Sequence, residues 1–422
     1  MIWIKRVTFF SLILCSFILV VNFVTHVPYF YISIELFLIL VFIAIRSRRS
    51  SNWKVFLINL AAIFLAIGFA EAFCAGWDGF GFSPGIEEDR ELFVQGGDAK
   101  ECGKLIDEWK FVDNVRGYAL PKNARINARK SFGDTVIYDV TYTSNKDGLR
   151  VSPHDLSYLS NITQNDSKNL IFFGCSCTLG EGVNDNETYP YLIEDKSRGQ
   201  YRSYNFAMEG YGPHQMLRIL ETGLLDSIIP ENKPAAFFYL ALTAHMYRSS
   251  CKYPYFTWDV NGPRYELNSF KEVIYAGKFN DNLISKIKFN IYGQLTKSHL
   301  ILGSFWIKQL IGWNVSQQDR ELFIAIILKS IKLISQKYKV PFYVIVWAND
   351  IWSDDSEDYE YIISELKKYQ VNLIETKDIF AKYESPKDKD SYLIKYDGHP
   401  NKLAYDRVAE YILKYIDTDR SK

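Results

Sequence analysis

The sequence predicts an α/β protein whose parallel sheet is covered by helices on both faces, preceded by three membrane-spanning helices. Short, fully apolar runs alternate with amphipathic helical periods in the C-terminal part of the 422 residues, as expected for strands buried on both faces. Three further apolar runs crowd the N-terminus. Basic and acidic residues balance at 49 each, so no net charge attracts nucleic acid, and no nucleic-acid partner is expected.

The N-terminal runs predict three transmembrane helices within residues 1–75. They cover about residues 7–24, 28–45 and 55–73, and each is close to the ~20 apolar residues that span a bilayer. A signal peptide followed by buried core helices is the alternative, but signal sequences have shorter apolar regions. Basic residues precede the first run and separate the second from the third. This pattern predicts a cytoplasmic N-terminus and an extracytoplasmic chain after about residue 73.

Residues 76–165 are predicted to lead into the main domain and to pack on it. The segment "DTVIYDVTYTSNKDGLRVSP" alternates β-branched and aromatic residues with polar ones, which indicates a strand or hairpin with a turn at Asp147 and Gly148. Cys102 and Cys251 fall in the predicted extracytoplasmic part and could form a disulfide there. No cysteine pair or Cys/His cluster has zinc-ligand spacing, so we predict no structural metal.

Residues 166–420 are predicted to form the main α/β domain. The expected strands are "NLIFFG" (169–174), "YNFA" (204–207), "AAFFYLAL" (235–242), "PFYVIVW" (341–347) and "VNLIE" (371–375). Helical apolar periods are centred on residues 216–224, 322–331, 359–366 and 403–415.

About a hundred residues separate the third and fourth expected strands, far more than one crossover helix requires. We therefore predict an insertion at about 250–320. Such insertions often build lids and binding surfaces, and a packed subdomain without a binding role is the alternative.

Two polar segments at predicted strand ends can supply nucleophilic chemistry. Ser176 follows the first strand and is the natural nucleophile, but a serine hydroxyl needs a base within hydrogen-bond reach. His399 in "YDGHPN" is the best candidate for that base. Asp397 can fix the imidazole tautomer if Gly398 bends the chain between them. Pro400 and Asn401 suit a helix start that would hold this loop still.

A developing oxyanion needs N–H donors, and the amides of Ser176 and Gly210 can provide two. The neighbouring Cys175 and Cys177 are alternative nucleophiles, although small buried cysteines are commoner. We interpret His214 as structural. Arg248 is a candidate ligand for a substrate carboxylate or a member of a surface ion pair. The aromatic residues of 253–258 are candidates for stacking on sugar rings or for core packing.

Three segments resemble blocks of the SGNH/GDSL hydrolase family, in the family's order along the chain: "FFGCSCTLGEGVNDNETYPY", "NFAMEGYGPHQM" and "DGHPN". Gly174-Cys175-Ser176 replaces the usual Gly-Asp-Ser, which is similar to membrane-anchored bacterial members. The resemblance covers roughly residues 135–415 apart from the insertion. It implies a three-layer α/β/α fold resembling flavodoxin, with no metal or cofactor. It also implies a Ser176-His399-Asp397 triad and oxyanion donors at the amides of Ser176 and Gly210.

The sequence departs from the family pattern in two places. The third block usually supplies an Asn side chain to the oxyanion site, whereas "ALTAHMYR" contains none. His245, Thr243 or Asn349 are the candidates to replace it. In addition, Asp397 precedes His399 by two residues, while many members place the Asp one residue further away.

The resemblance and the predicted location together imply a serine esterase or O-acyltransferase in the bacterial inner membrane. The expected substrates are acyl esters, chiefly acetyl esters, of a cell-envelope or exported glycan, and the expected partners are the bilayer and envelope polysaccharide machinery. Esterases and acyltransferases share the same triad, so the sequence leaves both open. The missing third-block Asn motivates an alternative of another class: an inactive glycan-binding or assembly protein tethered to the membrane.

Overall fold

The structure is a computed structural model of the chain. It describes residues 28–47, 50–79, 88–96, 105–107, 110–156, 167–229, 234–298, 301–302, 304–348, 356–380 and 389–419. The chain forms two compact units: Met1–Ile86 with Ile287–Trp313, and Glu87–Lys286 with Asn314–Lys422. We call the first the membrane-segment unit, after the spans predicted in it, and the second the α/β unit.

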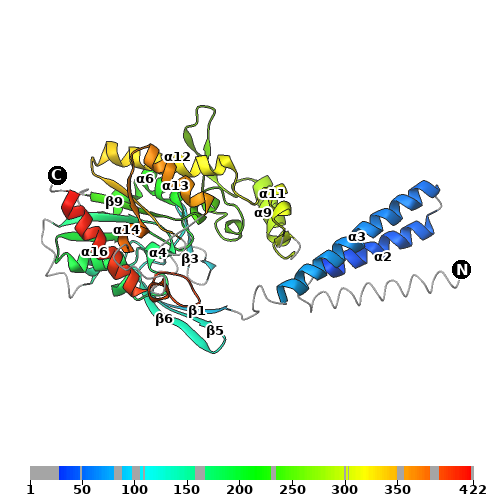
Figure 1. Ribbon diagram of the computed structural model, residues 1–422, viewed down its shortest axis with the longest axis horizontal. Coiled ribbons are helices and arrows are strands. Elements are labelled where there is room, and N and C mark those ends of the chain that lie inside the picture. Colours follow the sequence, from blue (N-terminus) through cyan, green and yellow to red (C-terminus); the bar gives the residue numbers. More distant parts are fainter. Residues whose placement is uncertain are drawn as a thin grey trace. The chain divides into compact units, whose positions relative to one another are not determined.

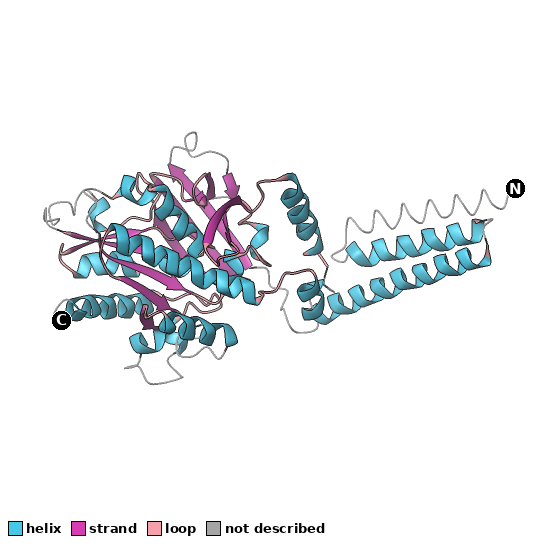
Figure 2. Ribbon diagram, turned by 90° about the horizontal axis from the view of Figure 1, so that it is seen from above, coloured by secondary structure: helices cyan, strands magenta, loops and turns pink. Residues whose placement is uncertain are grey.

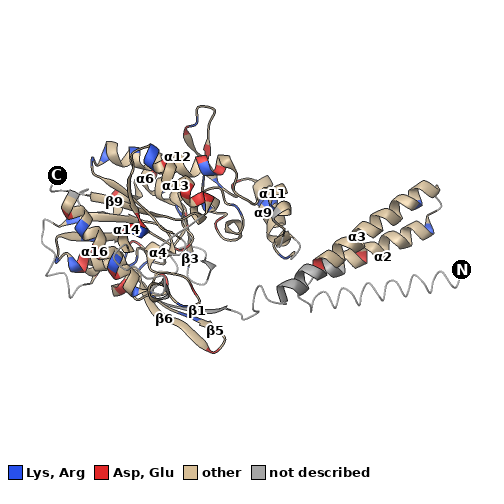
Figure 3. Ribbon diagram, in the orientation of Figure 1, with Lys and Arg blue, Asp and Glu red and all other residues tan. Residues whose placement is uncertain are grey.

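The membrane-segment unit contains two long apolar helices, α2 (Pro28–Arg46) and α3 (Ser51–Gly79), which pack side by side (Figure 1). Along most of their described length, both helices lack acidic and basic side chains (Figure 3). Within the described residues, one stretch, Ser51–Glu71, is long and apolar enough to cross a membrane. The second predicted span coincides with α2, and the first lies outside the described residues. The three-span topology therefore stays a prediction.

The α/β unit is built on a five-stranded parallel sheet, shown in magenta in Figure 2. Its strands are β7 (Lys168–Phe173), β8 (Tyr201–Asn205), β9 (Pro234–Ala241), β12 (Phe342–Val346) and β13 (Asn372–Glu375). They lie in the order β8-β7-β9-β12-β13, and each neighbouring pair is parallel. Counted along the chain, this is the flavodoxin-like order 2-1-3-4-5. All five predicted strands and the predicted parallel sheet are confirmed.

Helices cover both faces of the sheet because alternate strand residues point to opposite sides. Ile171 and Phe173 face one core with α6 (Pro213–Thr222), α12 (Gln317–Lys337) and α13 (Glu357–Lys368). Leu170 and Phe172 face the other core with α5 (Tyr189–Lys196) and α16 (Lys402–Asp419). Each fully buried side chain of this kind contributes about 1.5–3 kcal/mol to stability. The expected three-layer arrangement is confirmed.

Short helices complete the unit around the strand ends. They are α4 (Ser176–Leu179), α7 (Leu224–Ile228), α8 (Ala244–Ser249), α14 (Thr376–Phe380) and α15 (Lys389–Tyr392), with 3-10 turns at Pro153–Asp155, Asp185–Glu187 and Tyr255–Thr257.

The predicted insertion at 250–320 is divided between the two units. Its antiparallel pair β10 (Pro263–Leu267) and β11 (Val273–Lys278) belongs to the α/β unit. Its helix α11 (Phe305–Leu310) and most of α9 (Leu283–Leu295) belong to the membrane-segment unit.

The segment before the parallel sheet forms two small antiparallel sheets. One has the order β1 (Glu88–Gly96), β5 (Ala124–Phe132), β6 (Thr135–Thr143), and the other β2 (Leu105–Asp107), β3 (Lys110–Asp113), β4 (Gly117–Ala119). The strand predicted from "DTVIYDVTYT" is β6, which pairs with β5. The predicted turn follows it, where the Asn145 amide donates to the Leu149 carbonyl at 2.8 Å.

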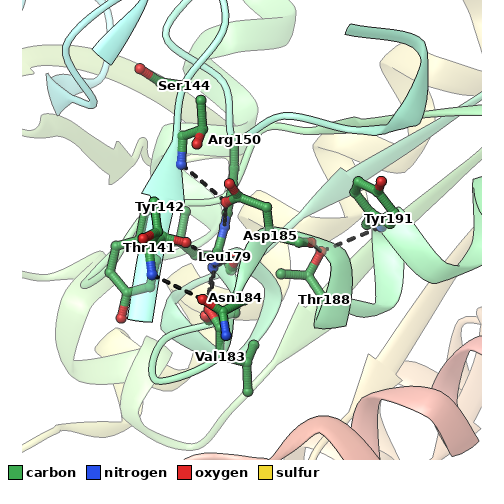
Figure 4. A network of polar contacts seen from close by, with 12 residues as sticks. Thr141, Tyr142, Ser144, Arg150, Leu179, Val183, Asn184, Asp185, Thr188 and Tyr191 are labelled. Carbon is green, nitrogen blue, oxygen red and sulfur yellow. Dashed lines mark hydrogen bonds and ion pairs between the residues drawn. The ribbon is translucent and has the colours of Figure 1, made fainter. Parts of the chain in front are cut away.

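Arg150, just after this turn, ties the lead-in to the loop that follows β7. Its guanidinium donates to the carbonyl oxygens of Leu179 (2.8 Å), Gly180 (2.5 Å) and Val183 (2.6 Å). Nε donates to Asp185 Oδ1 at 3.0 Å (Figure 4). The side chain is buried, so these bonds satisfy a charge that would otherwise be costly. The lead-in is therefore part of the packing that fixes this loop.

We expect Arg150→Met to lower the free energy of unfolding of the α/β unit by about 3–5 kcal/mol, because Asp185 loses its cationic partner and three carbonyl oxygens lose the guanidinium donor. Thermal or denaturant unfolding of the purified full-length protein measures the loss. Lys146→Met, at a side chain that is 77% exposed, is the control and should change stability by less than about 0.5 kcal/mol. Equal stabilities for the two variants would contradict the role assigned to Arg150.

Candidate active site

Ser176 lies at the first position of α4, immediately beyond the carboxyl end of β7. A Cβ on Gly174 would lie 2.2 Å from Thr178 Oγ1 and 2.8 Å from Thr178 Cβ, so only glycine fits the turn between strand and helix. The Ser176 amide belongs to the first turn of a helix, where N–H groups lack an intrahelical acceptor. β7 lies between β8 and β9, at the point where the strand order reverses, which is where open parallel sheets bind ligands.

His399 lies in the loop that enters α16. Asn401 caps this helix, because its Oδ1 accepts from the amides of Leu403 (3.0 Å) and Ala404 (3.2 Å). Gly398 has φ +84°, the left-handed conformation that favours glycine. The predicted bend and the predicted helix start are both present. The His399 carbonyl accepts from the Ile394 amide at 2.7 Å, which closes the loop.

The structure brings Ser176, His399 and Asp397 together. His399 Nε2 lies 2.9 Å from Ser176 Oγ, and His399 Nδ1 lies 2.5 Å from Asp397 Oδ1. The His399 side chain is 24% exposed and that of Asp397 is fully buried. The imidazole is therefore partly open to solvent, while its carboxylate partner is not. This geometry allows the Ser176 proton to pass to Nε2 while Nδ1–H donates to the carboxylate.

Two charged residues that the sequence analysis did not single out complete the cluster. Lys130 of β5 places Nζ 2.8 Å from the second oxygen of Asp397, and its side chain is only 13% exposed. Glu181 places Oε2 3.5 Å from His399 Nε2. Glu181 lies inside the first family-like block, so its proximity to Ser176 in the sequence could have marked it as a candidate site residue. Lys130 lies in a strand without a motif, 267 residues from its partner, and nothing local indicated it.

The charges around His399 favour its protonated form. Burial opposes protonation, but the carboxylates of Glu181 and Asp397 outweigh burial and raise the pKa of His399 to about 9. Burial likewise opposes ionisation of Asp397, but His399 and the Lys130 ammonium hold the pKa of that carboxyl well below its usual value. Asp397 thus remains a carboxylate over the whole range in which His399 titrates.

Glu181, Asp397 and His399 also form a possible cation-binding set, since their ligand atoms lie within 4.8 Å of one another. These atoms already have partners among the described residues: His399 Nε2 bonds to Ser176, and Asp397 bonds to both His399 and Lys130. The Lys130 ammonium also places positive charge beside the set. The arrangement therefore suits proton transfer better than cation binding.

Gly210 lies in the loop between β8 and α6. The carboxyl ends of adjacent strands β7 and β8 meet at one edge of the sheet, so the loops carrying Ser176 and Gly210 leave the sheet at that edge. Gly210 has φ +81°, and a Cβ there would lie 2.6 Å from Tyr118 Oη and 2.8 Å from Trp258 Nε1. Only glycine fits this position, while the oxyanion role of its amide stays a prediction.

The candidates for a third oxyanion donor have different outcomes. His245 is fully buried, and its Nδ1 lies 2.6 Å from Tyr239 Oη. Burial lowers the pKa of His245 and keeps it neutral. Its ring therefore packs inside the unit. Thr243 is the N-cap residue of α8. Asn349 lies outside the described residues.

The hydrogen bond of Ser176 Oγ to His399 Nε2, and not exposure, separates Ser176 from the alternative nucleophiles, since Ser176 is itself only 6% exposed. Cys175 is fully buried, and Cys177 is 7% exposed. A hydrogen bond with Cys175, together with burial, raises the pKa of Cys177 well above its usual value and keeps it a thiol. The expectation that both are small buried residues is confirmed.

The remaining predicted residues are mostly structural. His214 is buried, and its Nε2 lies 2.9 Å from the buried Asp259 Oδ2. The surface ion pair considered for Arg248 is wrong, because the residue is buried and donates to the Tyr211 carbonyl at 2.8 Å. Cys251 is buried and Cys102 lies outside the described residues, so their disulfide stays a prediction.

No protein-family model and no curated protein matches this chain. Among solved structures, the chain is similar to a protein described as lipolytic, of the G-D-S-L family, from Desulfitobacterium hafniense. That match has 11% identity, covers 59% of this chain and 99% of the other, and has a TM-score of 0.31.

Two further structural matches have similar values. An SGNH-hydrolase family esterase has 14% identity over 61% of this chain and 98% of its own, with a TM-score of 0.30. A carbohydrate esterase, whose active site is described as having divergent catalytic and non-catalytic binding functions, has 11% identity over 61% and 66%, with a TM-score of 0.30. The descriptions of the first two name the G-D-S-L and SGNH-hydrolase families, and the third is described as a carbohydrate esterase.

We expect the modification of Ser176 by a fluorophosphonate to accelerate as the pH rises through about 9, because only neutral His399 accepts the serine proton. Glu181→Gln removes a carboxylate 3.5 Å from Nε2, which lowers the pKa of His399 and shifts this rate profile toward neutral pH. Rates measured from pH 6 to pH 10 for wild type and variant test both statements.

Asp195→Asn is the matched control, since it removes one negative charge at an exposed position of α5. It should leave the profile unchanged. A Glu181→Gln profile that coincides with that of the wild type would contradict the electrostatic role of Glu181.

Proposed function

We propose that this chain is a serine esterase or O-acyltransferase that works through a Ser176-bound acyl intermediate. The observation that carries the proposal is the contact of Ser176 Oγ with His399 Nε2 at 2.9 Å, while His399 Nδ1 contacts Asp397. A hydroxyl, an imidazole and a buried carboxylate in this sequence of contacts are the parts that activate a serine for attack on a carbonyl. The esterases among the similar structures agree with this chemistry.

In the proposed reaction, Ser176 Oγ attacks the ester carbonyl as its proton passes to His399 Nε2. Asp397 accepts the hydrogen bond from Nδ1–H and stabilises the imidazolium that forms. The tetrahedral intermediate then breaks its bond to the leaving alcohol, which takes the proton back from Nε2. A water molecule or a second hydroxyl then loses a proton to His399 and attacks the acyl-serine. The second tetrahedral intermediate breaks its bond to Ser176 Oγ, which takes the proton back from Nε2, and the free acid or a new ester is released.

The oxyanion donors in this proposal are the amides of Ser176 and Gly210. Both residues follow neighbouring strands of the sheet, which supports the pairing. Losing one such donor costs about 100–1000-fold in rate in other enzymes. A chain with two donors instead of three is therefore expected to be a slow catalyst on small activated esters.

The proposed setting is the bacterial inner membrane, with the α/β unit on the extracytoplasmic side. The long apolar helix α3 and the distribution of basic residues support the anchor and its orientation. An O-acylated glycan of the envelope or an exported glycan is the proposed substrate, with water or a glycan hydroxyl as the acceptor. Envelope polysaccharide machinery is the proposed partner in this setting.

A fluorophosphonate probe tests the nucleophile directly. We expect the full-length protein in detergent to be labelled on the peptide containing Ser176, as located by mass spectrometry. Ser176→Ala should abolish the label, and His399→Gln should reduce its rate by at least about 100-fold, because the serine loses its base. Cys177→Ala is the matched control and should retain labelling.

Hydrolysis of p-nitrophenyl acetate by the same variants provides the second measurement. Equal turnover by wild type and Ser176→Ala, together with absent labelling, would exclude a serine enzyme. That outcome would leave the tethered binding protein as the better description.

A further inference from the structure

Residues 283–313 form a small helical hairpin, which we call the α9–α11 hairpin. Tyr292 of α9 donates its hydroxyl to the Ile311 carbonyl at 2.9 Å. The ring of Tyr292 meets the indole of Trp313 edge-on at 5.5 Å, and Trp313 is only 1% exposed. These contacts pack the two helices together on their inner side.

The outer side of the hairpin is strongly apolar. Leu283, Ile284, Ile287 and Ile291 are 72%, 80%, 51% and 53% exposed. Ile287 is three residues from Ile284 and four from both Leu283 and Ile291, so all four side chains lie on one side of α9. On α11, Trp306 and Leu310 are four residues apart and 80% and 86% exposed. A cluster of large exposed apolar side chains on adjacent helices marks an interaction surface.

The hairpin is attached to the apolar helix α3. Ser298, just after α9, donates its hydroxyl to Glu71 Oε2 at 2.7 Å, and both residues are buried. Glu71 is the last residue of the 21-residue apolar stretch Ser51–Glu71. At 1.5 Å per residue such a stretch is about 30 Å long, close to the thickness of the bilayer hydrocarbon core. If α3 spans a bilayer, Glu71 therefore lies where the helix reaches the headgroups.

We propose that the outer face of the α9–α11 hairpin lies in the lipid–water interface beside the end of α3. This inference rests on the membrane anchoring given under the proposed function. Lipid is the occupant that the observations favour, because the bond to Glu71 holds the hairpin at headgroup depth. The hairpin also carries Lys286, Lys288, Lys297 and Lys308, whose ammonium groups complement lipid phosphates.

The occupant can be identified by photo-crosslinking in the full-length protein reconstituted in phosphatidylethanolamine–phosphatidylglycerol vesicles. A benzophenone amino acid replaces Ile287 or Leu310, both on the outer face. Phe270 is the matched control: it is a large apolar residue of the same insertion, 83% exposed, between β10 and β11 of the α/β unit. We expect phospholipid adducts at Ile287 and Leu310 and none above background at Phe270.

Adducts to protein in place of lipid at Ile287 and Leu310 would overturn the inference and identify a packing face instead, on this chain or on a second copy. Equal lipid labelling at all three positions would also overturn it. Extraction of the same membranes with alkaline carbonate separates this failure from that of the proposed anchor. A chain that carbonate releases contradicts the anchor and the hairpin together, whereas a retained chain without lipid adducts contradicts the hairpin alone.

Discussion

The hydrogen bond between His399 Nε2 and Ser176 Oγ is the contact on which the site depends, because it joins residues 223 positions apart. No local structure holds them together. Ser176 is fixed by the end of β7, between β8 and β9, and His399 by the capped start of α16, which packs on one face of the sheet. The three-layer core therefore sets the distance between hydroxyl and imidazole, and a shift of the helix against the sheet would separate them.

Charges alternate along the site from Lys130 through Asp397 and His399 to Glu181. Such a row stabilises the imidazolium more than the neutral ring, which is why the pKa of His399 rises to about 9. At neutral pH most of the imidazole is then protonated, and only a small fraction is free to accept a proton. In the proposed reaction, the same charges stabilise the protonated ring while it holds the serine proton and returns it to the leaving alcohol.

The sequence predicted the parallel sheet and the meeting of three polar side chains, because both depend on short contiguous segments. Buried strands are uniform apolar runs, and Ser176, Asp397 and His399 stand in compact polar turns after them. Lys130 could not be predicted in this way, since its contact with Asp397 arises only when a lead-in strand packs on a loop 267 residues away. The sequence also could not predict that the insertion is divided between two units. The hydrogen bond that joins Ser298 of the insertion to Glu71 of α3 connects residues 227 positions apart.

The chain passes between its two units three times, after Ile86, Lys286 and Trp313. A single cut in the segment after α3 would not separate the two units, because residues 287–313 of the membrane-segment unit would remain covalently joined to the α/β unit. A fragment beginning after α3 would keep the exposed leucine and isoleucine side chains of α9 and would lose the Glu71 partner of Ser298. We expect such a fragment to self-associate unless residues 287–313 are replaced by a short polar linker.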